Sequence, residues 1–166
     1  MPRLKAVSGE IERHLAQLAE TVPTILNMTS GLSADELSWS SGQKEWSVVA
    51  ILAHLRGCSD VWSYSIYAML TENQPVLPLI DERRWAKNLG YAALSFEVSM
   101  SAFTSQRADL LRTLRALDAQ QWERTCQIEG RNHSVFSQMR RMALHEAEHG
   151  QQFQDVIDKL KNRQEQ

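Results

Sequence analysis

Apolar residues recur at steps of three and four along four long segments of the chain, which is the period of one helical face. The segments run over residues 8–27, 47–70, 92–117 and 134–160. No sustained alternation of apolar and polar residues, the pattern of a half-buried strand, occurs in the chain. The pattern therefore predicts an all-α protein, a four-helix bundle whose helices bury their apolar stripes against one another.

The segments between these helices suggest how the bundle is connected. Thr71–Trp85 contains two prolines and is long, so we expect it to form a crossover between the second and third helices. Thr125–Ile128 is expected to be extended but too short to make a sheet. Since no second domain or low-complexity segment is indicated, residues 1–166 are expected to form a single domain.

Capping and breaking residues mark several helix ends. Ser47 is placed to cap the second helix at its N-terminus. Ser33 and Glu36 fit a capping box, which predicts a short extra helical turn after the first helix. Pro23 falls inside the first helix and is expected to bend or shorten it.

Composition excludes several classes of function. Hydrophobic residues make up 43% and charged residues 23% of the chain, as in ordinary globular proteins, and the net charge of −2 offers no basic field for nucleic acid. The longest apolar run, residues 48–53, is too short to span a membrane, and the start of the chain does not resemble a signal peptide. Cys58 and Cys126 form neither a CxxC motif nor a disulfide framework. We therefore expect a cytoplasmic protein with neither nucleic-acid nor membrane partners.

Histidines on two helices are the strongest candidates for chemistry. The fourth helix carries His145-Glu146-Ala147-Glu148-His149, which matches H-E-x-x-H. Residues four apart lie about 40° apart on a helix, and His145 and His149 share the apolar stripe, so both should face the interior. His54 falls on the apolar stripe of the second helix in the same way. A lone inward histidine is more often a hydrogen-bonded core residue, but three of them in low dielectric predict a divalent metal ion.

Three kinds of metal site compete for these residues. A zinc peptidase needs a third ligand downstream, and the longer motif would require Gly at the position of Gln152 and His at that of Asp155. A di-iron bundle needs two Glu-x-x-His motifs, and only Glu146 with His149 supplies one. Three histidines with one or more open positions need only what is present, so this design is favoured and a metallopeptidase is disfavoured.

Two motifs give the chain a resemblance to a known family. Trp46 to Leu55 reads W-S-x-x-x-x-x-x-H-L, and His145 to Gln152 reads H-E-x-x-H-x-x-Q. In spacing, order and helix assignment the chain resembles the DinB-like superfamily of four-helix metal-binding proteins. The resemblance implies His54, His145 and His149 as ligands of one divalent ion, such as nickel, zinc or iron, and a homodimer. The family includes transferases that use low-molecular-weight thiols, an isomerase with a thiol cofactor, and members described as metal-dependent hydrolases.

Other residues near the predicted site admit more than one interpretation. Glu146 could act as a catalytic base on metal-bound water, pair with Arg140 or Arg141, or orient a metal ligand. Gln152 could bind substrate, hydrogen-bond a metal ligand, or be a buried residue with satisfied hydrogen bonds. Arg107 interrupts an apolar stripe, and could extend to solvent or bind an anionic substrate.

The remaining histidines and one cysteine are assigned no chemistry. Cys58 lies one turn after His54 and is interpreted as a core residue. His14 and His133 are interpreted as surface or capping residues. Trp62 is interpreted as a core residue that could also form a wall of the pocket.

Two classes of function follow. The first is a metal-dependent enzyme, a thiol S-transferase or a hydrolase, acting on a small molecule. The second is a non-catalytic metal-binding or stress-response protein that acts through its interactions. Closed structural zinc sites have four protein ligands, whereas only three are counted here, so the enzyme is favoured. A cavity that opens onto the free position of the metal would distinguish the two.

Overall fold

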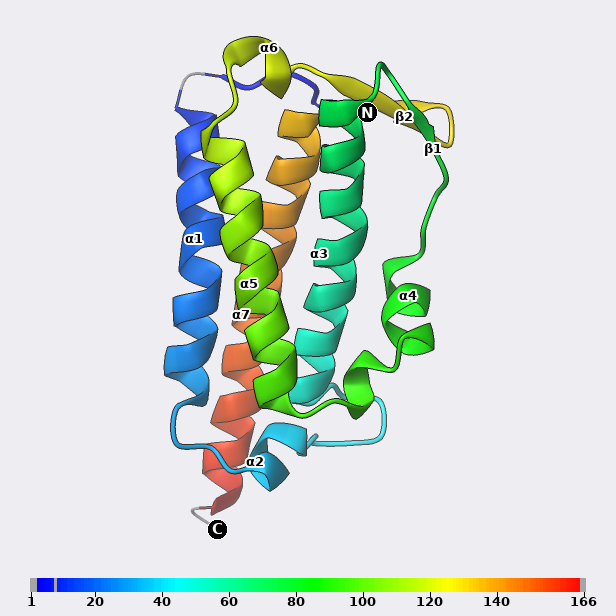
Figure 1. Ribbon diagram of the computed structural model, residues 1–166. Coiled ribbons are helices and arrows are strands. Elements are labelled where there is room, and N and C mark those ends of the chain that lie inside the picture. The colour runs from blue at the N-terminus through cyan, green and yellow to red at the C-terminus, as the bar shows by residue number, and fades with distance from the viewer. Residues whose placement is uncertain (1–2, 8, 165–166) are drawn as a thin grey trace.

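The four long helices lie side by side and form a bundle (Figure 1). The computed structural model describes residues 3–7 and 9–164. The bundle helices are α1 (Glu10–Thr29), α3 (Val48–Thr71), α5 (Phe96–Arg115) and α7 (Val135–Gln164). In Figure 1, α1 and α7 run in one direction along the bundle while α3 and α5 run in the other. Because α3 and α5 are parallel, the chain between them must return along the length of the bundle. The predicted four-helix bundle with its long crossover is therefore confirmed.

Helix ends deviate from the predicted ranges by a few residues. Ser8, with which the first predicted helix begins, lies outside the described residues. Pro23 does not shorten α1, which continues to Thr29. The third helix begins at Phe96 rather than at 92, because the Ser95 side chain accepts a hydrogen bond from the backbone N–H of Val98 and caps the helix. No helix within the described ranges combines the length and apolar character needed to cross a bilayer.

Short helices close the ends and one side of the bundle. The predicted capping box of Ser33 and Glu36 is confirmed at α2 (Ala34–Ser38), and Ser47 caps α3 as predicted. The crossover contains α4 (Glu82–Asn88), followed by the single turn η1 (Tyr91–Ala93), and both pack against α3. A further short helix, α6 (Ala119–Trp122), follows α5 at the end of the bundle where α7 begins (Figure 1).

A small sheet corrects one prediction. β2 (Thr125–Ile128) was expected to be too short to make a sheet, yet it pairs antiparallel with β3 (Arg131–Ser134) and parallel with β1 (Val76–Leu77). The hairpin turn has positive φ at Glu129 and Gly130, as in the tight turns that match strand twist. The partner β1 comes from the distant crossover, so local sequence around β2 could not reveal it.

The bundle core is divided along its length. In the described part of the chain, the buried apolar residues form two clusters. The first includes Leu18, Leu110 and Met139, and the second includes Ile51, Phe103 and Phe153. Buried or half-buried polar residues occupy the level between them: Thr21, His54, Arg107, His145, Glu146 and His149. The polar level of the bundle is therefore where its chemistry is concentrated.

The close approach of α4 to α3 depends on Gly57, and this gives a first prediction. A Cβ at Gly57 would lie 2.7 Å from the backbone O of Glu82 and 3.0 Å from the Cβ of Ala86. Gly57→Ala must therefore push α4 away, and we expect the free energy of unfolding in urea to fall by about 1–3 kcal/mol. Gly150→Ala is the control, because nothing lies within 4 Å of its Cβ position, and it should stabilise the helix by about 0.5–1 kcal/mol. Equal effects of the two substitutions would contradict this packing.

Candidate metal centre

Three imidazoles from two helices face one another at the polar level of the bundle. His54 comes from α3, and His145 and His149 come from successive turns of α7. The Nε2 atom of His145 lies 3.3 Å from Nε2 of His54 and 3.2 Å from Nε2 of His149. Two nitrogens bound to one tetrahedral ion at about 2.0–2.1 Å would be about 3.3–3.4 Å apart. The two distances to His145 each fit a pair of ligands on a single ion.

Gln152 sets the tautomer of one of these histidines. Its Oε1 lies 2.7 Å from Nδ1 of His149. An amide oxygen only accepts, so Nδ1 carries the proton and donates, and the neutral ring presents the lone pair of Nε2 to the other two histidines. This is the support that metal-binding histidines usually have. Of the roles predicted for Gln152, the hydrogen bond to a predicted ligand is present, and substrate binding stays a prediction.

His145 is the least satisfied of the three rings. Its Nδ1 is buried and has no hydrogen-bond partner, while its Nε2 faces two other nitrogens at once. A single ring proton on Nε2 could be directed at only one of them at a time. A divalent cation would satisfy all three lone pairs, so the residues present fit a metal ion.

The environment keeps the imidazoles neutral. Burial, reinforced by the neighbouring histidines, lowers the pKa of His54 to about 4. Burial, together with His149, likewise lowers the pKa of His145 to about 4. Burial also lowers the pKa of His149, and the hydrogen bond that His149 donates to Gln152 acts in the opposite direction. All three rings are therefore neutral at pH 7, the form in which imidazole binds metals.

Two indole rings enclose the histidines. The ring of Trp62 meets that of His145 edge-on at a centroid distance of 4.9 Å. The ring of Trp46 meets His54 edge-on at 5.1 Å and stacks on His149 at 6.0 Å. Trp46 belongs to the W-S motif, but sequence reasoning did not assign it to the wall. These apolar rings limit the access of water to the polar atoms between them.

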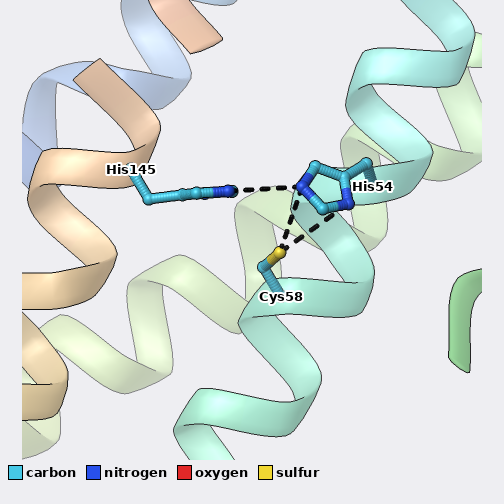
Figure 2. A group of neighbouring side chains, drawn as sticks. All are labelled: His54, Cys58 and His145. Atoms are coloured by element: carbon cyan, nitrogen blue, oxygen red, sulfur yellow. Dashed lines mark hydrogen bonds between the residues drawn. The ribbon is translucent and has the colours of Figure 1, made fainter. Parts of the chain in front are cut away.

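Cys58 lies closer to the site than the sequence suggested. Its Sγ is 3.5 Å from Nε2 of His54, and His54, Cys58 and His145 form a group able to hold a metal ion (Figure 2). Figure 2 shows His145 pointing from α7 toward His54, with the Cys58 sulfur below the His54 ring. Burial raises the pKa of the Cys58 thiol to about 12, so in the absence of a metal the sulfur keeps its proton.

A cavity opens beside His54. It has a volume of about 400 Å³ and is lined by His54, Trp46, small residues of α3, α4 and η1, and the cationic residues Arg83 and Lys87. Neither cation has a carboxylate partner among the described residues. The guanidinium of Arg83 lies 5.7 Å from the Trp46 ring centroid. Sequence reasoning missed both cations, because they lie in the crossover and only the docking of α4 on α3 brings them to the site.

Arg107 and Glu146 form a buried ion pair, which corrects two interpretations. Arg107 does not extend to solvent: it is 2% exposed, and its Nη2 donates to Oε1 of Glu146. Glu146 pairs with Arg107 rather than with Arg140 or Arg141, and also accepts from the Thr21 hydroxyl at 2.8 Å. Burial raises the pKa of the Glu146 carboxyl, and Arg107 and Thr21 act in the opposite direction. The catalytic role of Glu146 and the substrate-binding role of Arg107 stay predictions.

The two histidines interpreted as surface or capping residues behave differently. His14 is 1% exposed, and its Nδ1 contacts Oε1 of Gln17 at 2.6 Å, so its assignment to the surface was wrong. It lies three residues after Ile11 and four before Leu18, which places it inside the apolar stripe of α1. His133 is half-buried at the end of β3. Neither contacts the three facing histidines.

Bundle topology and facing imidazoles define the class of this protein as a helical bundle with a candidate metal centre between its helices. A family model described as the DinB superfamily matches residues 17–153, and the chain belongs to this superfamily. The resemblance inferred from the two motifs is thereby confirmed.

A solved structure shares the fold. YfiT from Bacillus subtilis, described as a probable metal-dependent hydrolase with an unusual four-helix bundle topology, superposes with a TM-score of 0.80. The alignment covers 97% of this chain and 93% of that chain at 14% sequence identity. At this identity the likeness shows the fold alone. No protein of curated function matches the sequence.

The buried ion pair gives a second prediction. Arg107→Met preserves most of the side-chain length but leaves the Glu146 carboxylate buried and unpaired. We therefore expect the free energy of unfolding in urea to fall by about 3–5 kcal/mol. Adding Glu146→Gln removes the isolated charge and should recover part of the loss. Arg112→Met is the control, because Arg112 pairs with Asp109 on the exposed face of the same helix, and it should cost less than about 1 kcal/mol. A similar loss in both arginine variants would contradict the role given to the buried pair.

The lowered pKa values give a third prediction, for the metal-free protein. The folded state keeps His54 and His145 neutral down to about pH 4, whereas in the unfolded chain they take up protons near the ordinary histidine pKa of 6.5. The unfolded state binds more protons than the folded state between pH 4 and pH 6.5. The free energy of unfolding is therefore highest above pH 6.5 and decreases as the pH falls toward 4. Urea unfolding with chelator at a series of pH values measures the slope. The double variant His54→Asn/His145→Asn should have a shallower slope, and an unchanged slope would count against the assigned pKa values.

Proposed function

We propose that this protein is a metal-dependent enzyme that acts on a small molecule, with His54, His145 and His149 as the ligands of one divalent ion. The observation that carries the proposal is the cavity of about 400 Å³ beside His54, whose Nε2 and that of His149 each lie at ligand spacing from Nε2 of His145. Cavities of this size accept small organic molecules. When bound, the ion would polarise a water or a thiol at its open position and make it more acidic.

The protein's own residues supply binding and orientation in this proposal. Gln152 holds the proton of His149 on Nδ1 and so keeps its other nitrogen available. Trp46 and Trp62 exclude water from the two sides of the histidine group. Arg83 and Lys87, which lack carboxylate partners among the described residues, are positioned to bind the anionic part of a substrate in the cavity. A substrate with a negative charge is therefore favoured.

Two reactions fit such a site. One is hydrolysis, consistent with the description of YfiT as a probable metal-dependent hydrolase. The other is transfer of a low-molecular-weight thiol, which family resemblance suggests and which would use the same acidified position for sulfur in place of water. Nickel, zinc and iron all accept imidazole ligands, so the residues alone do not select the ion. The homodimer implied by the family is part of the proposal.

One observation favours a different function, a closed site that only holds metal. Cys58 lies 3.5 Å from Nε2 of His54 and could complete four ligands, as in structural zinc sites. The open site is favoured over this alternative because the cavity meets His54. Cys58→Ser separates the two. If the site is open, Cys58→Ser should leave metal content and turnover unchanged. If the site is closed, the same substitution should lower the affinity for the metal.

Metal binding gives the fourth prediction. Untagged protein should bind about one equivalent of nickel, zinc or iron(II) by elemental analysis, and His54→Ala and His149→Ala should each abolish tight binding. Gln152→Ala should weaken affinity about 10–100-fold, because His149 loses the partner that sets its tautomer. Gln151→Ala is the control, since Gln151 hydrogen-bonds Asp155 on the exposed side of α7, and it should leave affinity unchanged. Metal content below a tenth of an equivalent after loading would refute the site.

The reaction is tested with the same variants. Metal-loaded protein is incubated with a panel of anionic esters and amides, and with small thiols plus electrophiles. Arg83→Met should raise KM for anionic substrates more than it changes kcat, because Arg83 is proposed to bind rather than react. If no turnover depends on both metal and His54, the enzymatic proposal fails even if the metal is bound.

A further inference from the structure

A second cavity, of about 440 Å³, lies outside the metal centre. It is bounded by α3, the start of α7, the end of the crossover and the β2–β3 hairpin, and none of His54, His145 and His149 lines it. Trp62 lines this cavity and also meets the ring of His145 edge-on. The two sites are therefore neighbours that share one indole ring.

Gln138 is the unexplained residue of this cavity. It lies in the first turns of α7 and is 1% exposed, and neither its Nε2 nor its Oε1 has a hydrogen-bond partner. A buried amide that loses water without gaining a partner is unfavourable, and such groups are rare in folded proteins. An occupant of the cavity with both a donor and an acceptor would satisfy both ends of the amide.

The charges of the cavity wall are predominantly positive. Arg131 and Arg140 line it, and neither has a carboxylate partner among the described residues. The Nε of Arg140 is buried and unpaired. Two acidic residues also line the cavity, Glu82 and Glu129. Glu82 already accepts hydrogen bonds from Trp62 and Arg141. Free guanidinium groups beside an apolar wall are a common means of binding oxyanions.

We propose that this cavity binds a small organic anion that carries an amide group, with its carboxylate on Arg140, its amide on Gln138 and its apolar part against Trp62 and Ile80. Arg131 at the hairpin adds a second positive charge at the mouth. The guanidinium of Arg141 stacks on the Trp62 ring at 4.3 Å and, through Glu82, fixes the ring that the ligand would contact. This site is separate from the proposed substrate cavity, which is lined by His54 and Arg83.

Hippurate is a suitable probe, because it combines a carboxylate, one amide and an aromatic ring. Calorimetric titration of the full-length protein should detect its binding, with and without metal. Hippuramide, which lacks the charge, and 4-phenylbutyrate, which lacks the amide, should each bind at least about tenfold more weakly, which corresponds to the loss of one good polar contact. The side-chain amide resonances of Gln138 should shift on addition of hippurate.

Variants assign the binding to this cavity. Gln138→Leu and Arg140→Met should each weaken hippurate binding about tenfold or more. Gln138→Leu should keep the fold and should not lower the urea midpoint, since the amide has no partner to lose. Arg112→Met, on the exposed face of α5, is the matched control and should bind hippurate as the unmodified protein does. His149→Ala should also retain binding, which separates this site from the metal centre.

Three results would overturn the proposal. The first is the absence of hippurate binding, which would mean that water alone satisfies Gln138. The second is equal binding of hippurate and hippuramide. The third is binding that survives both Gln138→Leu and Arg140→Met, or that disappears in His149→Ala and so belongs to the metal centre.

Discussion

The buried ion pair between Arg107 and Glu146 fixes the orientation of α7, on which the candidate site depends. Arg107 extends from α5 across the bundle interior, and the carboxylate that it meets is also held by Thr21 of α1. Breaking such a pair leaves a charge in low dielectric, so the rotation of α7 that keeps it intact is strongly favoured. His145 is the residue before Glu146, about 100° around the helix axis, and that same rotation turns it toward His54 on α3.

The polar level of the bundle is tolerated because apolar clusters on both sides of it carry the packing. Leu18, Leu110 and Met139 belong to one cluster, and Phe103 and Phe153 to the other. Burial between them lowers the pKa values of the histidines, and neutral imidazoles are the form that metals require. Desolvation at the polar level of the bundle therefore disfavours protonation of the histidines and keeps their nitrogen lone pairs available for a metal ion.

The crossover converts a closed bundle into one with cavities. Asp60 of α3 accepts hydrogen bonds from Trp85 of α4 and from Tyr91 of η1, at 3.0 Å and 2.6 Å, and Trp62 donates to Glu82 at 2.6 Å. These bonds hold the crossover against α3, with one cavity beside His54 and the other beside Trp62. Because both cavities border the histidines or the indole that packs on them, movement of α4 would alter both.

Sequence alone determined the helical bundle, its long crossover and the inward positions of His54, His145 and His149, because helical periodicity is local and shows which face of a helix is buried. It also determined the family, through two motifs with fixed spacing. Tertiary structure decided what each helix meets: the pairing of Glu146 with Arg107, the burial of His14, and the sheet between β2 and a distant crossover strand. It also brought Arg83 to the histidines and left Gln138 without a partner, because contacts between segments far apart in the chain depend on how the elements dock and not on any local pattern.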